Sequence, residues 1–145
     1  MSEKVIQVSF PGGVRVNAET KGFVIQTDQP AHEGGTNAAP APFDLFLASL
    51  ATCAGYFVLL FCQERRIQTA GLALSMRSEK NPETKMIDRI SIEITLPSGF
   101  PEKYKNAVIK AADQCTVKRH MLKPPTFAVE AKILPSPLFL RLRKP

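Results

Sequence analysis

The chain has 145 residues and a mass of 16.0 kDa, enough for one domain that buries roughly two thirds of its unfolded surface without metal or disulfide staples. Hydrophobic residues make up 44% and charged residues 22%, which excludes an intrinsically disordered chain. The net charge of +6 is spread along the chain with no nucleic-acid-binding motif, so we expect no nucleic-acid partner. Three cysteines, an odd number, argue against a disulfide framework. Together with the missing apolar signal segment, they predict a cytoplasmic protein.

The first part of the chain predicts three short strands. Residues 5–8, 14–17 and 22–25 have strand composition, and the turn signal Pro11-Gly12-Gly13 separates the first two. Because the connections are short, we expect an antiparallel meander. The stretch 28–42 then lacks periodicity, and it is rich in proline and contains a Gly-Gly pair. It predicts a long loop, and loops of this length in compact domains are often functional.

Residues 45–61 predict a helix without a polar face. Pro42 suits the first helical turn, and Asp44 complements the positive end of the helix. A transmembrane helix needs about 20 apolar residues, and this run is slightly short for that. We favour a buried central helix, because apolar and polar residues alternate in the rest of the chain as they do in the strands of soluble proteins. We therefore expect no membrane partner. A single small sheet cannot cover such a helix, so a dimer is expected to bury it.

The second half predicts a hairpin and a second helix. Apolar and polar residues alternate over 72–76 and again over 90–96, with a turn at Asn81-Pro82 between them. The second helix begins at Pro101 and has a regular apolar stripe ending at Cys115. The members of the stripe are Tyr104, Ala107, Val108, Ala111, Ala112 and Cys115.

The C-terminal part predicts a short helix over 116–122 and a last strand. That strand covers 126–133 and places Phe127, Val129, Ala131 and Ile133 on one face. The order βββ–α–ββ–α–β predicts an α+β fold with antiparallel pairing in a single domain, 1–145. Its core is expected at about 3–134, followed by a basic tail, 135–145, for which we favour a packed or frayed state over contact with an acidic partner or a membrane surface.

The three cysteines are candidates for chemistry. Cys53 and Cys62 are nine residues apart, about 900° of helical rotation, so they lie on opposite faces and cannot pair within one straight helix. Cys53 and Cys115 both lie on faces expected to point inward, and they are either a redox pair or small packing residues. No CxxC or HExxH occurs, and neither His32 nor His120 has a second ligand at helical spacing. We therefore expect no metal and no cofactor.

Two motifs in this order resemble the OsmC and organic hydroperoxide resistance superfamily. They are GGTNAAPAPFDLFLASLATC, residues 34–53, and DQCTVKRHM, residues 113–121. The resemblance extends over nearly the whole chain, to about residue 134. It implies an OsmC-like intertwined homodimer in which antiparallel sheets enclose two central helices.

The resemblance also implies a reaction. Cys53 would attack an organic hydroperoxide as a thiolate and become a sulfenic acid, Cys115 would condense with it to a disulfide, and an external dithiol would reduce that disulfide. The reactive thiolate would need a nearby cation or helix terminus to lower its pKa. Four aromatic residues are candidates to line an apolar substrate pocket: Phe43, Phe46, Tyr56 and Phe57.

The chain departs from the family pattern in its activating residues. Hydroperoxidases of this family have a glutamate ten residues before the first cysteine, where this chain has Phe43, with Asp44 one residue later. They also have an activating arginine, for which Arg15 is the nearest N-terminal candidate. Other cations that could take its place are Lys21, His32, Arg119 and His120. The departure leaves an alternative open: a non-catalytic dimer that binds a small ligand or senses redox state, with both cysteines as packing residues.

Overall fold

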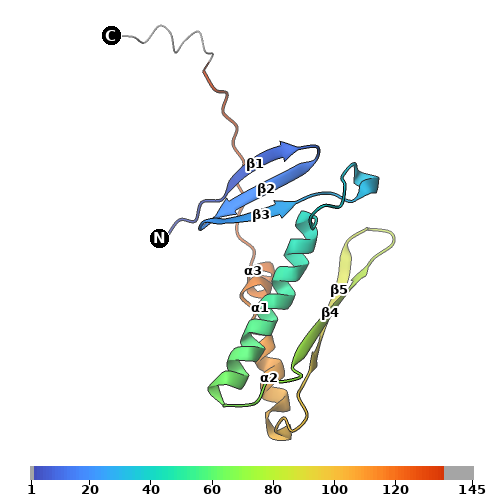
Figure 1. The fold of residues 1–145 in the computed structure, drawn as a ribbon, viewed down its shortest axis with the longest axis vertical. Coiled ribbons are helices and arrows are strands. Elements are labelled where there is room, and N and C mark those ends of the chain that lie inside the picture. Colours follow the sequence, from blue (N-terminus) through green and yellow to red (C-terminus); the bar gives the residue numbers. More distant parts are fainter. Residues whose placement is uncertain (1, 136–145) are drawn as a thin grey trace.

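The computed structural model describes residues 2–135 and has an α+β architecture with two separate antiparallel sheets (Figure 1). The strands are β1 (Gln7–Gly12), β2 (Arg15–Thr20), β3 (Phe23–Thr27), β4 (Ala73–Lys80) and β5 (Ile87–Thr95). The helices are α1 (Pro42–Glu64), α2 (Lys105–Ala112) and α3 (Thr116–Leu122), with short 3-10 helices η1 (Ala31–Glu33) and η2 (Glu102–Tyr104). All but one of the predicted regular elements are present.

The predicted meander forms a three-stranded sheet in the order β1-β2-β3. Its central strand pairs Ala18 with Val8 on one side and with Ile25 on the other. No residue of β1 is buried, and Phe10 and Phe23 are largely exposed. Figure 1 shows this sheet beyond the N-terminal end of α1 and apart from the β4–β5 hairpin. One copy of the chain therefore leaves an apolar sheet without a core.

The loop before α1 is organised around one buried carboxylate that sequence reasoning did not single out. Asp28 is 1% exposed and accepts hydrogen bonds from the amides of Gln29, Thr36 and Ala38 and from the Thr36 hydroxyl, at 2.7–3.1 Å. These bonds hold the pKa of Asp28 far below its usual range, the Thr36 hydroxyl contributing most. The loop thus closes on itself and delivers the chain to the start of α1.

The long apolar helix forms as predicted, but one copy of the chain buries only one of its sides. Its start is closed by Asp44, which accepts a hydrogen bond from the Ala41 amide at 3.0 Å. The buried side consists of Leu50, Ala54, Val58, Phe61 and Cys62. On the opposite side Tyr56 is 58% exposed, and only 28% of the residues in the most apolar window are buried. The expected full burial is therefore absent from a single copy, because one hairpin and one short helix cover one side only.

By length and composition, α1 is also the one helix in the described part of the chain that would suffice to cross a membrane. The core helix of a soluble protein meets the same criterion.

The core lies between α1, α2 and the β4–β5 hairpin. Val58, Phe61 and Cys62 of α1 pack with Val108 and Ala111 of α2. The hairpin side chains Leu72, Leu74, Ile94 and Leu96 cover this cluster. The predicted apolar stripe of the second helix is thus confirmed as the inward face.

The predicted continuous helix from Pro101 to Cys115 is wrong in one respect, because the backbone leaves the helix after α2. Cys115 has φ −47° and ψ 117°, and its sulfur accepts a hydrogen bond from the Lys118 amide at 3.4 Å. Cys115 is therefore the N-cap of α3 and not the last residue of the preceding helix. The separate helix expected over 116–122 is confirmed.

The last predicted strand is wrong for a single copy of the chain. Residues 124–135 form no regular structure, and Phe127, Val129 and Ile133 are at least 87% exposed. A strand requires a neighbouring edge to accept its backbone hydrogen bonds, and no strand among the described residues pairs with this segment. Nearly all of the predicted basic tail, from residue 136 onward, lies outside the described residues.

Candidate active site

The structure brings two of the three cysteines together at the crossing of α1 and α3. Cys53 lies in the middle of α1 and is half-buried, while Cys115 precedes α3 and is 2% exposed. Both are free thiols; the Cys115 thiol donates a hydrogen bond to the Leu50 carbonyl oxygen, and the two cysteines are close enough for each to shift the pKa of the other. The pair is therefore placed so that one sulfur can react with the other.

The surroundings of Cys53 favour its thiolate. Burial by itself raises the pKa of Cys53, but hydrogen-bond donors of three consecutive residues outweigh it and lower the pKa overall. These donors are the Val117 amide, the Cys115 thiol, and the amide and hydroxyl of Thr116. Because a thiolate accepts hydrogen bonds, these donors stabilise the ionised form of Cys53, which is the nucleophilic form of a cysteine.

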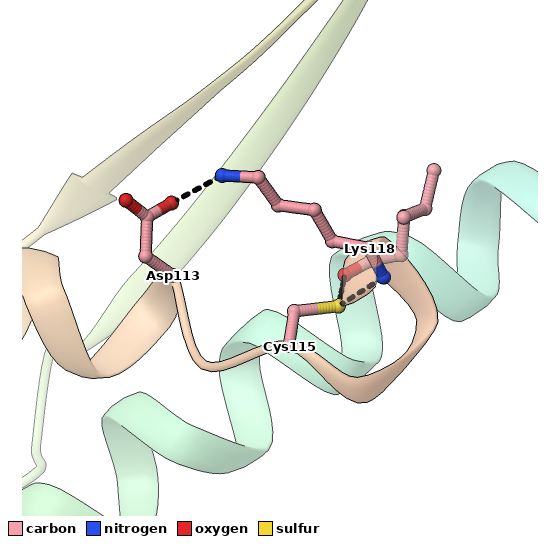
Figure 2. A network of polar contacts seen from close by, with 4 residues as sticks. Asp113, Cys115 and Lys118 are labelled. Carbon is pink, nitrogen blue, oxygen red and sulfur yellow. Dashed lines mark hydrogen bonds and ion pairs between the residues drawn. The ribbon is translucent and has the colours of Figure 1, made fainter. Parts of the chain in front are cut away.

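The surroundings of Cys115 have the opposite effect. Burial raises the pKa of Cys115, and its hydrogen bond and proximity to the Cys53 thiolate raise it further, against the amides of Lys118 and Val117. Its sulfur also lies 3.8 Å from the Leu50 carbonyl oxygen. Figure 2 shows the Cys115 sulfur beside the start of α3, with an ion pair between Lys118 and Asp113 close to it. The surroundings therefore favour the thiolate at Cys53 and the protonated thiol at Cys115.

An apolar cleft of about 950 Å³ lies between α1, β5, α2 and α3. Phe43, Phe46 and Leu50 of α1 form one wall, and isoleucines of β5 form another. Met121 and Leu122 of α3 contribute to the remaining side. Cys115 is part of this lining, whereas Cys53 is not.

The four predicted pocket residues fall into two groups. Phe43 and Phe46 line the cleft. Tyr56 and Phe57 do not; they form an edge-to-face pair with ring centroids 5.3 Å apart, farther along α1. The helix is long enough to separate them, because Phe57 follows Phe46 by eleven residues, about 16 Å of helical rise. In a single copy, Tyr56 and Phe57 therefore lie outside this cleft, and a role for them in a substrate pocket stays a prediction.

The two predicted activating residues have other positions. The Asp44 carboxylate is engaged at the start of α1, nine residues and about 13.5 Å of helical rise before Cys53. Arg15 lies on β2 with its guanidinium against Gly12 of β1. The groups that lower the pKa of Cys53 belong instead to residues 115–117. In the sequence, these donors belong to the start of the short helix predicted over 116–122, directly after Cys115. The first amides of a helix have no partner within the helix, so they can donate to a nearby sulfur.

The other candidate cations have local partners, lie at a turn or are exposed. His32 lies 3.7 Å from Glu33 in η1, and the His120 ring is 2.7 Å from the Thr116 carbonyl oxygen. Lys21 occupies the turn between β2 and β3 with φ +51°, and Arg119 is exposed on α3.

Cys62 has a structural role. It is fully buried in the core cluster, and burial raises its pKa. Its separation from the Cys53–Cys115 pair confirms the helical-face argument from the sequence.

Comparison with known proteins decides the family. Residues 34–130, two thirds of the chain, match the family described as OsmC-like protein. The chain belongs to the OsmC-like family. The matched region includes the Asp28-bound loop from Gly34 onward, Cys53, Cys115 and the whole cleft, so it contains the candidate site. No curated protein matches the chain.

Solved structures agree with the OsmC-like fold at low sequence identity. A protein from Psychrobacter arcticus has a TM-score of 0.70 and 22% identity, with 82% of this chain and 88% of that chain covered. An OsmC-like protein from Mycoplasma pneumoniae has a TM-score of 0.66 and 17% identity, with coverage of 85% and 89%. An organic hydroperoxide resistance protein OsmC from Legionella pneumophila has a TM-score of 0.55 and 18% identity, with coverage of 83% and 90%.

Proposed function

We propose that this OsmC-like protein is a cytoplasmic thiol-dependent peroxidase that reduces organic hydroperoxides. The observation that carries the proposal is the position of Cys53 beside the start of α3, where residues 115–117 lower its pKa while the pKa of the neighbouring Cys115 is raised. The name of the Legionella pneumophila protein, which shares the fold, points to the same substrate class. The apolar walls of the cleft fit organic hydroperoxides better than hydrogen peroxide.

The reaction has three balanced steps. The Cys53 thiolate attacks one peroxide oxygen, a sulfur–oxygen bond forms, the O–O bond breaks, and the alkoxide leaves as an alcohol after taking up a proton. The Cys115 sulfur, losing its proton, then attacks the Cys53 sulfenic acid; the disulfide forms and water leaves. An external dithiol finally reduces the disulfide and becomes oxidised itself.

We further propose that the active form is a homodimer. One copy leaves three apolar features uncovered: the β1–β3 sheet, the side of α1 around Tyr56, and the extended segment 126–134. These features together are larger than the scattered apolar residues of an ordinary monomer surface. A second copy that covers α1 and pairs with segment 126–134 would remove all three, and α1 would then be a buried helix rather than a membrane helix.

Substitution of the first cysteine tests the reaction. Cys53→Ser is expected to lower the consumption of cumene hydroperoxide in the presence of dithiothreitol by more than about 100-fold, because it removes the nucleophile. Cys62→Ser is the matched control, since Cys62 is buried away from the pair, and it should retain the rate if it folds. Equal rates of cumene hydroperoxide consumption for the wild type and Cys53→Ser would contradict the proposal.

Substitution of the second cysteine separates the steps. Cys115→Ser is expected to consume about one equivalent of peroxide rapidly and then accumulate a Cys53 sulfenic acid, which dimedone traps for mass spectrometry. Continued turnover at the wild-type rate would contradict the role of Cys115.

The cleft supports a second candidate function, the binding of a small apolar ligand without catalysis. Its volume of about 950 Å³ lies in the range of small-molecule sites. If Cys53 of the wild type fails to react with dimedone after peroxide treatment, the binding function is favoured over the peroxidase.

A further inference from the structure

The first turn of α3 depends on polar contacts for its position. None of the residues of α3 is buried, so the packing of its side chains contributes little. A helix of this length is not stable by itself in water. The donors of Thr116 and Val117 therefore stay beside the Cys53 sulfur only as long as the contacts around them hold the turn in place.

The residues on either side of these donors supply three such contacts (Figure 2). The Cys115 thiol donates to the Leu50 carbonyl oxygen of α1 at 3.8 Å, and the Lys118 amide donates to the Cys115 sulfur at 3.4 Å. The Lys118 ammonium forms an ion pair with Asp113, which directly follows the last residue of α2. Lys118 therefore ties the first turn of α3 both to its N-cap residue and to the end of α2.

The Asp113–Lys118 ion pair spans the break between the two helices. Its members are five residues apart, and the backbone leaves the helical conformation between them, at Cys115. Ion pairs within one helix join residues three or four positions apart, so this pair connects two helices rather than two turns of one. The segment that it encloses contains Thr116 and Val117.

We propose that Asp113 and Lys118 are positioning residues for Cys53, because their ion pair holds the first turn of α3 against that cysteine. Neither side chain is among the groups that hydrogen-bond to the Cys53 sulfur, so both act through the residues between them. The inference adds two residues to the candidate site. It rests on the proposed function only for the substrate that the thiolate attacks.

A direct electrostatic effect of Asp113 would have the opposite sign. A negative charge near a thiolate disfavours ionisation, so removal of a carboxylate that acted on the sulfur itself would lower the pKa of Cys53. Removal of a carboxylate that positions α3 releases the hydrogen-bond donors and raises that pKa. Among the described residues, Cys115 is the one titratable group that shifts the pKa of Cys53.

The exposure of the ion pair sets the size of the effect. The side chains of Lys118 and Asp113 are 46% and 68% exposed. Ion pairs in such surroundings change equilibrium constants by no more than about fivefold. Loss of the pair is therefore expected to lower the thiolate fraction of Cys53, at pH values below its midpoint, by about two- to fivefold.

Alkylation of Cys53 by iodoacetamide tests the proposal without any peroxide. Asp113→Ala is expected to raise the pH midpoint of the alkylation rate, with peptide mass spectrometry assigning the product to Cys53. The maximum rate at high pH should be retained, because the substitution changes the thiolate fraction and not the access to the sulfur. A midpoint that falls or stays in place, or a changed maximum rate with no shift, overturns the proposal.

Substitutions of the lysine test whether the two residues act as a pair. Lys118→Met is expected to raise the midpoint as much as Asp113→Ala does, and the double variant should raise it no further. Lys118→Arg keeps a cation that can reach the carboxylate and should retain the wild-type midpoint. Additive shifts in the double variant, or loss of the midpoint in Lys118→Arg, would overturn the role of the ion pair.

Glu102→Ala is the matched control. Glu102 forms an exposed ion pair with Lys105, the first residue of α2, at 3.9 Å. The substitution removes the same charge as Asp113→Ala from a pair that does not reach α3, so the midpoint should stay in place. An equal shift in both variants would contradict a specific role of Asp113. Circular dichroism checks that the variants fold, which the exposure of these side chains favours.

The outcomes separate this inference from the proposed function. A protein that reduces hydroperoxides but keeps its Cys53 midpoint in Asp113→Ala overturns the inference alone. A protein that shows the expected shift but reduces no hydroperoxide overturns the peroxidase alone.

Discussion

Cys53 acquires its reactive environment from hydrogen-bond donors rather than from a cation. Residues 115–117 supply two backbone amides, one hydroxyl and one thiol to its sulfur. Backbone amides require no particular side chain, so this part of the environment does not depend on the Arg and Glu that the chain lacks. The thiolate can therefore be stabilised although Arg15 and Asp44 have other positions.

The pH dependence of Cys53 alkylation follows from its lowered pKa. Since iodoacetamide reacts with the thiolate, the alkylation rate of Cys53 should reach half its maximum below the ordinary thiol pKa of about 8.5. Thr116→Val removes the hydroxyl donor and is expected to raise this midpoint. Thr52→Val, which removes a hydroxyl bonded to the Ala48 carbonyl instead, should leave the midpoint in place.

The lowered pKa of Asp28 predicts that the stability of the folded protein also depends on pH. Its pKa is lower in the folded protein than in the unfolded chain, so it contributes stability above the unfolded pKa of about 3.9, and this contribution is lost as the pH falls toward the folded pKa. Asp28→Asn should therefore lower the Tm at pH 7, and the difference from wild type should narrow below about pH 4. Thermal unfolding followed by circular dichroism measures both, and equal Tm values at pH 7 would contradict the role assigned to Asp28.

At the scale of elements, the loop before α1 depends on the close approach of Gly35 to the backbone of Gln29. A Cβ at Gly35 would lie 1.8 Å from the Gln29 carbonyl oxygen, so the backbone must move to accept any side chain there. Gly35→Ala is expected to lower the free energy of unfolding by more than about 1 kcal/mol.

Gly55 of α1 provides the control for this substitution. No described atom outside its immediate helix surroundings lies within 4 Å of the Cβ position at Gly55, and alanine is a better helix former than glycine. Gly55→Ala should therefore not destabilise the protein, as measured by urea unfolding. If Gly35→Ala lowers the free energy of unfolding no more than Gly55→Ala does, the close-packing argument is refuted.

Elements with strong local patterns could be predicted from the sequence, whereas the residues at which they end were harder to predict. The uninterrupted apolar run of α1 and the alternation of β4 and β5 identified these elements correctly. The break before Cys115 was missed because the apolar stripe continues across it at helical spacing, although the backbone does not. The strand expected over 126–133 was wrong for one copy because alternation marks two faces but does not supply a neighbouring edge.

At the scale of the whole molecule, the exposed apolar surface predicts a homodimer. Light scattering coupled to gel filtration should give about 32 kDa, twice the 16.0 kDa of one chain. A chain ending at residue 125 lacks the exposed segment proposed to pair with the second copy, and it should dimerise more weakly. A wild-type protein that stays monomeric at micromolar concentration without detergent would overturn the dimer.

The sequence by itself determined the local features: most of the helices and strands, the inward stripe of the second helix, the opposite faces of Cys53 and Cys62, and the family motifs around Cys53 and Cys115. These follow from periodicity and residue type, which act within a few residues of the chain. The tertiary structure decided what surrounds the sulfurs. Cys53 and Cys115 are 62 residues apart, and their contact depends on the packing of α2 against α1, which places the first amides of α3 beside Cys53 and turns Cys115 toward the cleft. Such contacts vary over ångströms while residue patterns stay the same, and for that reason only the folded arrangement shows that the pKa of Cys53 is lowered and that of Cys115 is raised.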